Sequence, residues 1–306
     1  MTDYRLITFQ DASGPRAGLA VGDRFLPAAE ATGVAADADM HAILDDWPAA
    51  SARLERAAAA VATGGRPLGE ARLLPPVHFP VTIYCAGANY SDHAARMAQK
   101  LGVAPEPDPH EHGLKPWHFI KPSRTAVGDG ASVSVSSRAL DWEAELAVVI
   151  GTQARHVSVE SALGHVAGYM NAIDFSARDL SRRPHISDTS PFKYDWVGQK
   201  CFDGSCPLGP TLVPAAQVPD PQALSIKLWV NDQLRQDSST GKMIFSIAEQ
   251  IAHLSSRLTL HPGDVILTGT PMGVGAETGE HLDDGDVVRV EIAGLGRLTA
   301  TVGSTA

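Results

Sequence analysis

The segment from Leu140 to Gly151 places the strongest constraint on how this chain can fold. After Asp141 it is rich in residues that pack on a pleated sheet, which predicts a buried strand. Glu143 and Glu145 are two positions apart, so both carboxylates leave the same face of that strand. Two buried anions need a cation, and without an interleaved Cys or His the pair suits magnesium, manganese or calcium better than zinc. On these residues alone, a half-exposed strand with two solvated glutamates is an equal alternative.

The overall composition narrows the class of protein. The chain has 306 residues, enough for one large domain with a smaller one attached. No apolar run approaches the roughly 20 residues that span a bilayer, and the first residues lack the pattern of a signal peptide. The three cysteines lack the close spacing of a zinc or redox motif, so we expect a cytoplasmic protein with reduced thiols and no membrane association. The net charge of -10 argues against a nucleic-acid partner.

Turn signals divide the chain into a small N-terminal domain, residues 1–74, and a larger domain, residues 75–306. The boundary lies in a proline-rich stretch that reads as an extended linker, because each proline biases its predecessor away from helix. The residue pattern predicts strands at 4–10, 17–26, 81–87, 224–231, 264–268 and 287–292. It predicts helices at 41–63, 92–100, 159–170 and 246–258. The expected fold class is therefore mixed and β-rich (α+β).

Two neighbouring loops are candidates for function. The turn at 87–93 joins a predicted strand to a predicted helix, a place where side chains commonly face a cleft. Residues 103–116, with four prolines, read as a mobile insert. Its cluster His110-Glu111-His112 has the residue types of a metal site, but no further ligand lies at helical or strand spacing from it. A solvated loop is therefore the preferred interpretation of that cluster.

Seven motifs occur in an order that matches one known family. They are Gly87-x-Asn89-Tyr90-x-Asp92-His93, Asp141-Trp142-Glu143-x-Glu145, Asp174-Phe175-Ser176-Ala177-Arg178-Asp179, Lys200-x-Phe202-Asp203, Pro207-Leu208-Gly209-Pro210, the series Asn231, Gln236 and Thr240, and the Gly-rich segment from Gly263 to Gly275. Through these motifs the sequence resembles the fumarylacetoacetate hydrolase family over about residues 80–300. The resemblance implies a mixed β-sandwich roll with a small N-terminal α/β domain, usually assembled as a homodimer. It also implies that Glu143, Glu145 and Asp174 hold Mg²⁺ or Mn²⁺, with Ca²⁺ as the other hard cation that suits them.

The same resemblance assigns roles to further residues. Lys200 would add positive charge against a developing enolate, and a structural ion pair with Asp203 is the alternative for it. Arg178 is either a substrate contact or a partner of a ligand carboxylate. The substrate contacts that the resemblance implies, besides Arg178, are Tyr90, Gln236 and Thr270.

His93 is the candidate general base, because an imidazole titrates near neutral pH. For a lone histidine at a helix start, a packed or capping side chain is the alternative. Many family members carry a glutamate three residues later, where this chain has Arg96, which cannot accept the imidazole proton. Three interpretations of Arg96 remain open. It binds a substrate carboxylate, and Glu106 or Glu111 of the insert supplies the missing carboxylate to His93 when a lid closes. Alternatively, the chain catalyses a different reaction of the same enolate, or it is a weakened catalyst that keeps the metal site. We prefer the first, because the insert follows this helix directly, as a lid would.

Together these residues predict a metal-dependent hydrolase that breaks a carbon–carbon bond in a small diketo acid, of the fumarylpyruvate or acylpyruvate kind met in aromatic catabolism. Metal binding would polarise a carbonyl and stabilise the enolate that departs. The alternative on the same platform is a 2-oxo acid decarboxylase of the oxaloacetate type, or a tautomerase or isomerase, none of which needs an attacking water. From another class, a non-catalytic metal-binding protein is the third hypothesis, which Arg96 favours.

Overall fold

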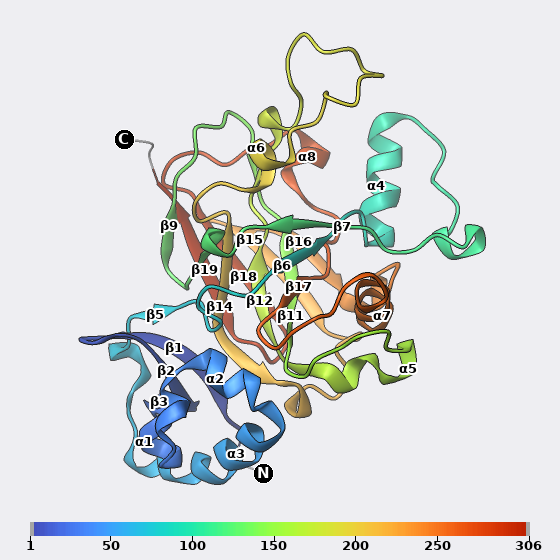
Figure 1. Cartoon of the computed structure of the whole chain (residues 1–306). Coiled ribbons are helices and arrows are strands. Elements are labelled where there is room, and N and C mark those ends of the chain that lie inside the picture. Colours follow the sequence, from blue (N-terminus) through green and yellow to red (C-terminus); the bar gives the residue numbers. More distant parts are fainter. Residues whose placement is uncertain (1–2, 304–306) are drawn as a thin grey trace.

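Two β-sheets that share one hydrophobic core form the body of the molecule (Figure 1). The computed structural model describes residues 3–303. The larger sheet runs in the order β4 (Arg66–Pro67), β3 (Arg24–Pro27), β2 (Gly14–Val21), β1 (Arg5–Asp11), β14 (Cys206–Pro214), β12 (Val166–Ile173), β11 (Ala144–Ile150), β17 (Val265–Leu267), β6 (Ile83–Ala86) and β7 (His118–Lys121). The smaller sheet runs in the order β16 (Gln233–Ser239), β15 (Ser225–Val230), β18 (Val287–Ile292), β19 (Arg297–Val302) and β9 (Ala131–Val133). This architecture confirms the predicted mixed, β-rich fold class.

Short strands and helices complete the fold. The short strands β5 (Leu73–Leu74) and β8 (Ala126–Val127) pair with β1 and β14, and β10 (Leu140–Asp141) pairs with β13 (Ser176–Ala177). The α-helices are α1 (Ala28–Thr32), α2 (Met40–Asp45), α3 (Trp47–Gly64), α4 (Ser91–Leu101), α5 (Val159–Ala162), α6 (Trp196–Lys200), α7 (Ile247–Arg257) and α8 (Gly275–Thr278). Helices α4, α6 and α8 lie toward one end of the sheets in Figure 1, where the candidate site forms.

Strand β11 lies between two cores. Its side chains alternate, so Leu146 and Val148 pack toward the smaller sheet and α7, whereas Ala147 and Val149 pack toward α2 and α3. All seven residues of the strand are buried. Burial on both faces explains the nearly continuous apolar run and fixes the position of the acidic residues at its start.

The N-terminal segment differs in detail from the prediction. The segment 17–26, predicted as one strand, is split into β2 and β3 by a tight turn in which Gly22 has a φ of 58°. The helix predicted at 41–63 is two helices that meet at Asp46. Strand β1 pairs with β14, so the N-terminal strands continue the larger sheet. The division into domains 1–74 and 75–306 stays a prediction.

The segment 159–170 was predicted as a helix, and most of that prediction is wrong. Helix α5 ends at Ala162, a short 3₁₀ turn follows, and β12 begins at Val166. All eight residues of β12 are buried between β11 and β14. A strand covered on both faces shows no alternation of apolar and polar residues, so its pattern resembles that of a buried helix.

Helix α4 and the insert after it lie beside the site (Figure 1). The helix begins at Ser91, whose hydroxyl donates to the Lys242 carbonyl and does not cap the helix. Gly102 ends it in the left-handed conformation, with a φ of 66°. In the insert, the His110 ring contacts Asp108 and Glu249, so it is engaged in ion pairs at the protein surface.

Candidate metal and catalytic site

Three buried carboxylates converge at the end of β11. Glu145 lies on β11, and Glu143 lies in the break between β10 and β11. Asp174 directly follows β12, and its backbone N–H donates to the Glu143 carbonyl at 2.9 Å, which brings the two segments together. One carboxylate oxygen from each residue lies within 4.8 Å of the others. The three predicted metal ligands therefore form one cluster.

Two lysine side chains contact this cluster. Lys200 Nζ lies 2.9 Å from Glu143 Oε2 and 2.5 Å from Asp174 Oδ2. It therefore pairs with the candidate ligands, and the alternative of an ion pair with Asp203 is not observed. Lys121 Nζ lies 2.5 Å from Asp174 Oδ1 and is fully buried. Lys121 was missed by the sequence analysis, although a lysine inside a strand-like run was a usable signal.

The charges of the site leave room for a divalent ion. Burial raises the pKa of the Glu145 carboxyl well above its ordinary value, and the charges of Asp174 and Glu143 raise it further. Burial acts the same way on Glu143, but Lys200 and Arg178 outweigh it and hold the pKa of that carboxyl far below its usual range. The described residues place four carboxylates against three cations here: Asp141, Glu143, Glu145 and Asp174 face Lys121, Lys200 and Arg178. Three convergent oxygen donors fit Mg²⁺ or Mn²⁺, and a bound cation would favour the ionised form of Glu145.

Arg178 pairs with a ligand carboxylate, one of its two predicted roles. Its Nη2 lies 2.5 Å from Glu143 Oε1, and its Nε donates to Asp141 Oδ2 at 2.8 Å. Asp141 is fully buried and also accepts hydrogen bonds from the backbone N–H groups of Gly275 and Ala276, at 2.6 and 3.0 Å. Asp141 thus ties the metal ligands to the first turn of α8.

His93 has a carboxylate partner that the sequence analysis did not find. His93 Nδ1 lies 2.6 Å from Glu277 Oε1, and Glu277 Oε2 accepts from the Gly273 N–H at 2.8 Å. Glu277 lies on α8 and is buried. Because Nδ1 faces the carboxylate, Nε2 is the nitrogen that remains to exchange a proton with a substrate.

The insert does not supply this carboxylate. Glu106 and Glu111 are both exposed, and the His93 ring is already bonded to Glu277. Arg96 is exposed, and its guanidinium donates to Gln99 Oε1 at 2.6 Å. In this structure Arg96 does not line the cavity at the carboxylates. The carboxylate that contacts the His93 ring in this structure is therefore Glu277, which comes from a distant segment.

A cavity of 140 Å³ brings most of the predicted residues together. Its polar side is lined by His93, Glu143, Glu145, Arg178, Lys200 and Thr270. Gln236 and Tyr90, predicted as substrate contacts, do not line it. The Gln236 amide accepts from the Ala144 N–H at 2.9 Å and donates to Thr270 Oγ1 at 3.0 Å, so it positions the strand and the threonine. The Tyr90 hydroxyl is buried and finds no hydrogen-bond partner among the described residues.

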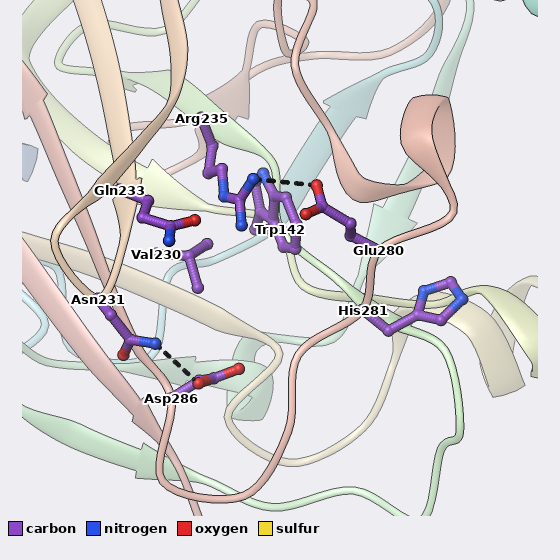
Figure 2. A pocket seen from close by; sticks show the side chains of 8 residues that line it. All are labelled: Trp142, Val230, Asn231, Gln233, Arg235, Glu280, His281 and Asp286. Atoms are coloured by element: carbon purple, nitrogen blue, oxygen red, sulfur yellow. Dashed lines mark hydrogen bonds and ion pairs between the residues drawn. The ribbon is translucent and has the colours of Figure 1, made fainter.

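A separate pocket of 340 Å³ is lined by Trp142, the β15–β16 hairpin and the segment 280–286. Figure 2 shows Arg235 beside the Trp142 ring, with its guanidinium directed at Glu280, 3.0 Å away. Asn231 Nδ2 donates to Asp286 at 2.9 Å in the same pocket. None of the predicted site residues lines this pocket. The smaller cavity at the carboxylates is therefore the candidate site.

A family model described as fumarylacetoacetate (FAA) hydrolase, C-terminal, matches residues 82–303. The chain belongs to the fumarylacetoacetate hydrolase family. Human oxaloacetate tautomerase FAHD2B, a mitochondrial protein, is 40% identical over 234 residues, which cover 75% of this chain and 69% of the human protein. Oxaloacetate tautomerase YisK of Bacillus subtilis is 40% identical over 243 residues, which cover 77% of this chain and 74% of YisK.

A solved structure of the same family covers nearly the whole chain. Maleylpyruvate hydrolase from Sphingobium sp. SYK-6, in complex with manganese(II) and pyruvate, is 31% identical and has a TM-score of 0.75 over 99% of this chain and 100% of its own. These matches confirm the family resemblance and the fold that it implied. The relatives named here are enzymes, and the manganese ion in one of them supports a metal site at the acidic cluster. Within residues 3–303, no helix is long and apolar enough to cross a membrane.

Proposed function

We propose that this protein is a divalent-metal-dependent tautomerase that interconverts the keto and enol forms of oxaloacetate or a similarly short 2-oxo dicarboxylic acid. The observation that carries the proposal is that His93, whose ring is paired with Glu277, lines one small cavity together with Glu143, Glu145 and Lys200. Oxaloacetate tautomerases at 40% identity support it as well. Tautomerisation replaces hydrolysis, the reaction that the motifs led us to expect, as the first choice.

The metal site contributes in a defined way. Glu143, Glu145 and Asp174 would hold Mg²⁺ or Mn²⁺, which when bound supplies Lewis-acid polarisation of the substrate carbonyl. Lys200 adds a fixed positive charge beside these ligands. Burial alone would lower the pKa of Lys200, but Asp174 and Glu143 outweigh it and raise that pKa, so the ammonium group stays charged. Lys200 therefore stabilises negative charge on the substrate oxygen and does not act as a proton donor.

His93 moves the proton. Tautomerisation transfers one proton between the carbon next to the carbonyl and the carbonyl oxygen, and it consumes no water. His93 Nε2 takes the proton from the carbon, while Glu277 holds the ring in place and stabilises the imidazolium that forms. The imidazolium then gives this proton to the carbonyl oxygen, which completes the enol, and the same ring carries it back to the carbon in the reverse direction. Thr270 Oγ1 lies in the cavity wall, where its hydroxyl can hydrogen-bond a substrate oxygen.

Hydrolysis of a carbon–carbon bond in a fumarylpyruvate or acylpyruvate type of diketo acid is the second candidate. It is favoured by the similarity to maleylpyruvate hydrolase over 99% of this chain. In that reaction the His93–Glu277 pair would activate a water molecule. A cytoplasmic location, a role in aromatic catabolism and a homodimer stay predictions.

The test follows the enol and keto forms of oxaloacetate by ultraviolet absorbance, with Mg²⁺ or Mn²⁺ and then with EDTA. We expect metal-dependent interconversion well above the buffer rate, without CO₂ or carbon–carbon cleavage in the product mass spectrum. The variant His93→Asn should lose this activity, whereas His281→Asn, an exposed histidine outside the cavity, should keep it. Cleavage of acetylpyruvate without acceleration of oxaloacetate tautomerisation would establish the second candidate instead.

A further inference from the structure

Three aromatic side chains line the same cavity as the carboxylates: Trp117, Phe119 and Trp196. Trp117 and Phe119 are two positions apart at the start of β7 and lie on the same side of it. Phe119 stacks on Trp196 with ring centroids 5.5 Å apart, and Trp117 meets the same ring edge-on at 5.7 Å. We refer to these three residues as the aromatic wall.

The aromatic wall is anchored to the catalytic residues on two sides. Trp196 is the first residue of α6, and Lys200 is its last. Lys200 Nζ also lies 5.2 Å from the centre of the Phe119 ring. The wall is therefore held at a fixed place beside the cation that would face the substrate oxygen.

The Trp117 ring packs directly against the backbone of Gly87. A Cβ atom at position 87 would lie 1.9 Å from a ring atom of Trp117, much closer than any real contact. Only glycine allows the indole to approach the backbone of the turn that leads to His93.

Trp117 and Trp196 both line the cavity and remain partly exposed, at 48% and 42%, so they lie between the carboxylates and the protein surface. We propose that Trp117 and Trp196 determine specificity by limiting the length of the substrate, so that the site accepts short 2-oxo acids and rejects those with a longer chain. This inference rests on the proposed function, because it concerns the 2-oxo acids that the same site would bind.

The experiment measures binding, so that it does not depend on turnover. Calorimetric titrations of the Mn²⁺-loaded protein with pyruvate, 2-oxobutyrate, 2-oxopentanoate and 2-oxohexanoate give affinity as a function of chain length. We expect wild-type affinity to fall at least about tenfold along the series, as a filled pocket rejects added methylene groups. In Trp196→Ala the decline should disappear, while the affinity for pyruvate stays within about threefold of wild type.

A matched control is Trp229→Ala, which removes a partly buried tryptophan on β15 outside this cavity and should keep the wild-type decline. If Trp196→Ala fails to fold, as judged by circular dichroism, Trp196→Leu takes its place with the same expectation. Equal binding of short and long acids by the wild-type protein, or a wild-type decline in the Trp196 variant, overturns the inference alone. Absence of binding by every acid in the series also overturns the inference, and absence of binding by oxaloacetate in the same titration overturns the proposed function as well.

Discussion

Replacing Asp141 by asparagine tests whether a buried carboxylate outside the ligand set holds the site together. Asp141 accepts four hydrogen bonds. Trp142 and Gly275 N–H groups donate to Oδ1 at 2.8 and 2.6 Å, and Arg178 Nε and the Ala276 N–H donate to Oδ2 at 2.8 and 3.0 Å. An asparagine amide nitrogen cannot accept a hydrogen bond, so one of these pairs of donors loses its acceptor in either orientation of the amide.

The expected cost follows from this count. Each buried donor left without a partner costs about 1–3 kcal/mol, so two of them cost about 2–6 kcal/mol. Part of this is recovered, because burial raises the pKa of the Asp141 carboxyl and shows that its charge is costly to bury, although Arg178 opposes that effect. We therefore expect a loss of about 2–3 kcal/mol in the free energy of unfolding.

Two measurements check this prediction. Urea denaturation of Asp141→Asn should show the lower stability, and turnover should fall about 10–100-fold because α8 and Glu277 shift away from His93. Asp237→Asn, which alters a surface ion pair with Lys227, is the control and should change stability by less than about 1 kcal/mol. An Asp141→Asn protein with wild-type stability and wild-type turnover would refute the argument that this carboxylate connects the ligands to α8.

Three further predictions concern the ligands, the base and the response to acid. Glu145→Gln should weaken Mn²⁺ binding by more than about 100-fold in calorimetry, because a direct ligand contributes more than its outer-shell neighbours, and unchanged binding would exclude it as a ligand. Glu277→Gln should reduce turnover about 10–100-fold while Mn²⁺ binding stays at the wild-type level; a loss of metal binding would contradict its assignment to the base. Burial lowers the pKa of His118 to about 4, so the unfolded chain binds this proton first. The stability that neutral His118 contributes is complete above about pH 6.5 and is lost as pH falls toward 4, at most about 3 kcal/mol. His118→Phe should flatten this loss in denaturation curves measured across that range, and an unchanged slope would show that other groups cause it.

The metal ligands were predictable from the sequence because their signal is local or belongs to the family motifs. Glu143 and Glu145 are neighbours on one segment at the start of an apolar strand. Their carboxylates repel each other and are costly to bury unless a cation neutralises them. Asp174 entered through the resemblance, and the pairing of β11 with β12 places it beside them. The capping pair at the start of α7 shows the same locality, since the Ser246 and Glu249 side chains each bond the other's backbone as their spacing suggests.

The features that could not be predicted from the sequence depend on contacts between segments that are far apart in the chain. Glu277 has no special spacing to any motif, and only the folded chain places it beside His93. The strand β12 was taken for a helix because its neighbours cover both of its faces and remove the alternation that identifies a strand. The role predicted for Arg96 came from a local substitution that the sequence shows directly, whereas the contact between His93 and the distant Glu277 appears only in the folded chain.

His93 and Glu277 are separated by 184 positions in the sequence, and this separation affects when the site forms during synthesis of the chain. Contacts between such distant segments form late, because a long stretch of chain must be ordered before they bring any gain in free energy. The ligands Glu143, Glu145 and Asp174 all leave the ribosome about a hundred residues before Glu277 does. We therefore expect nascent chains arrested before α8 to remain inactive, because His93 cannot yet pair with Glu277.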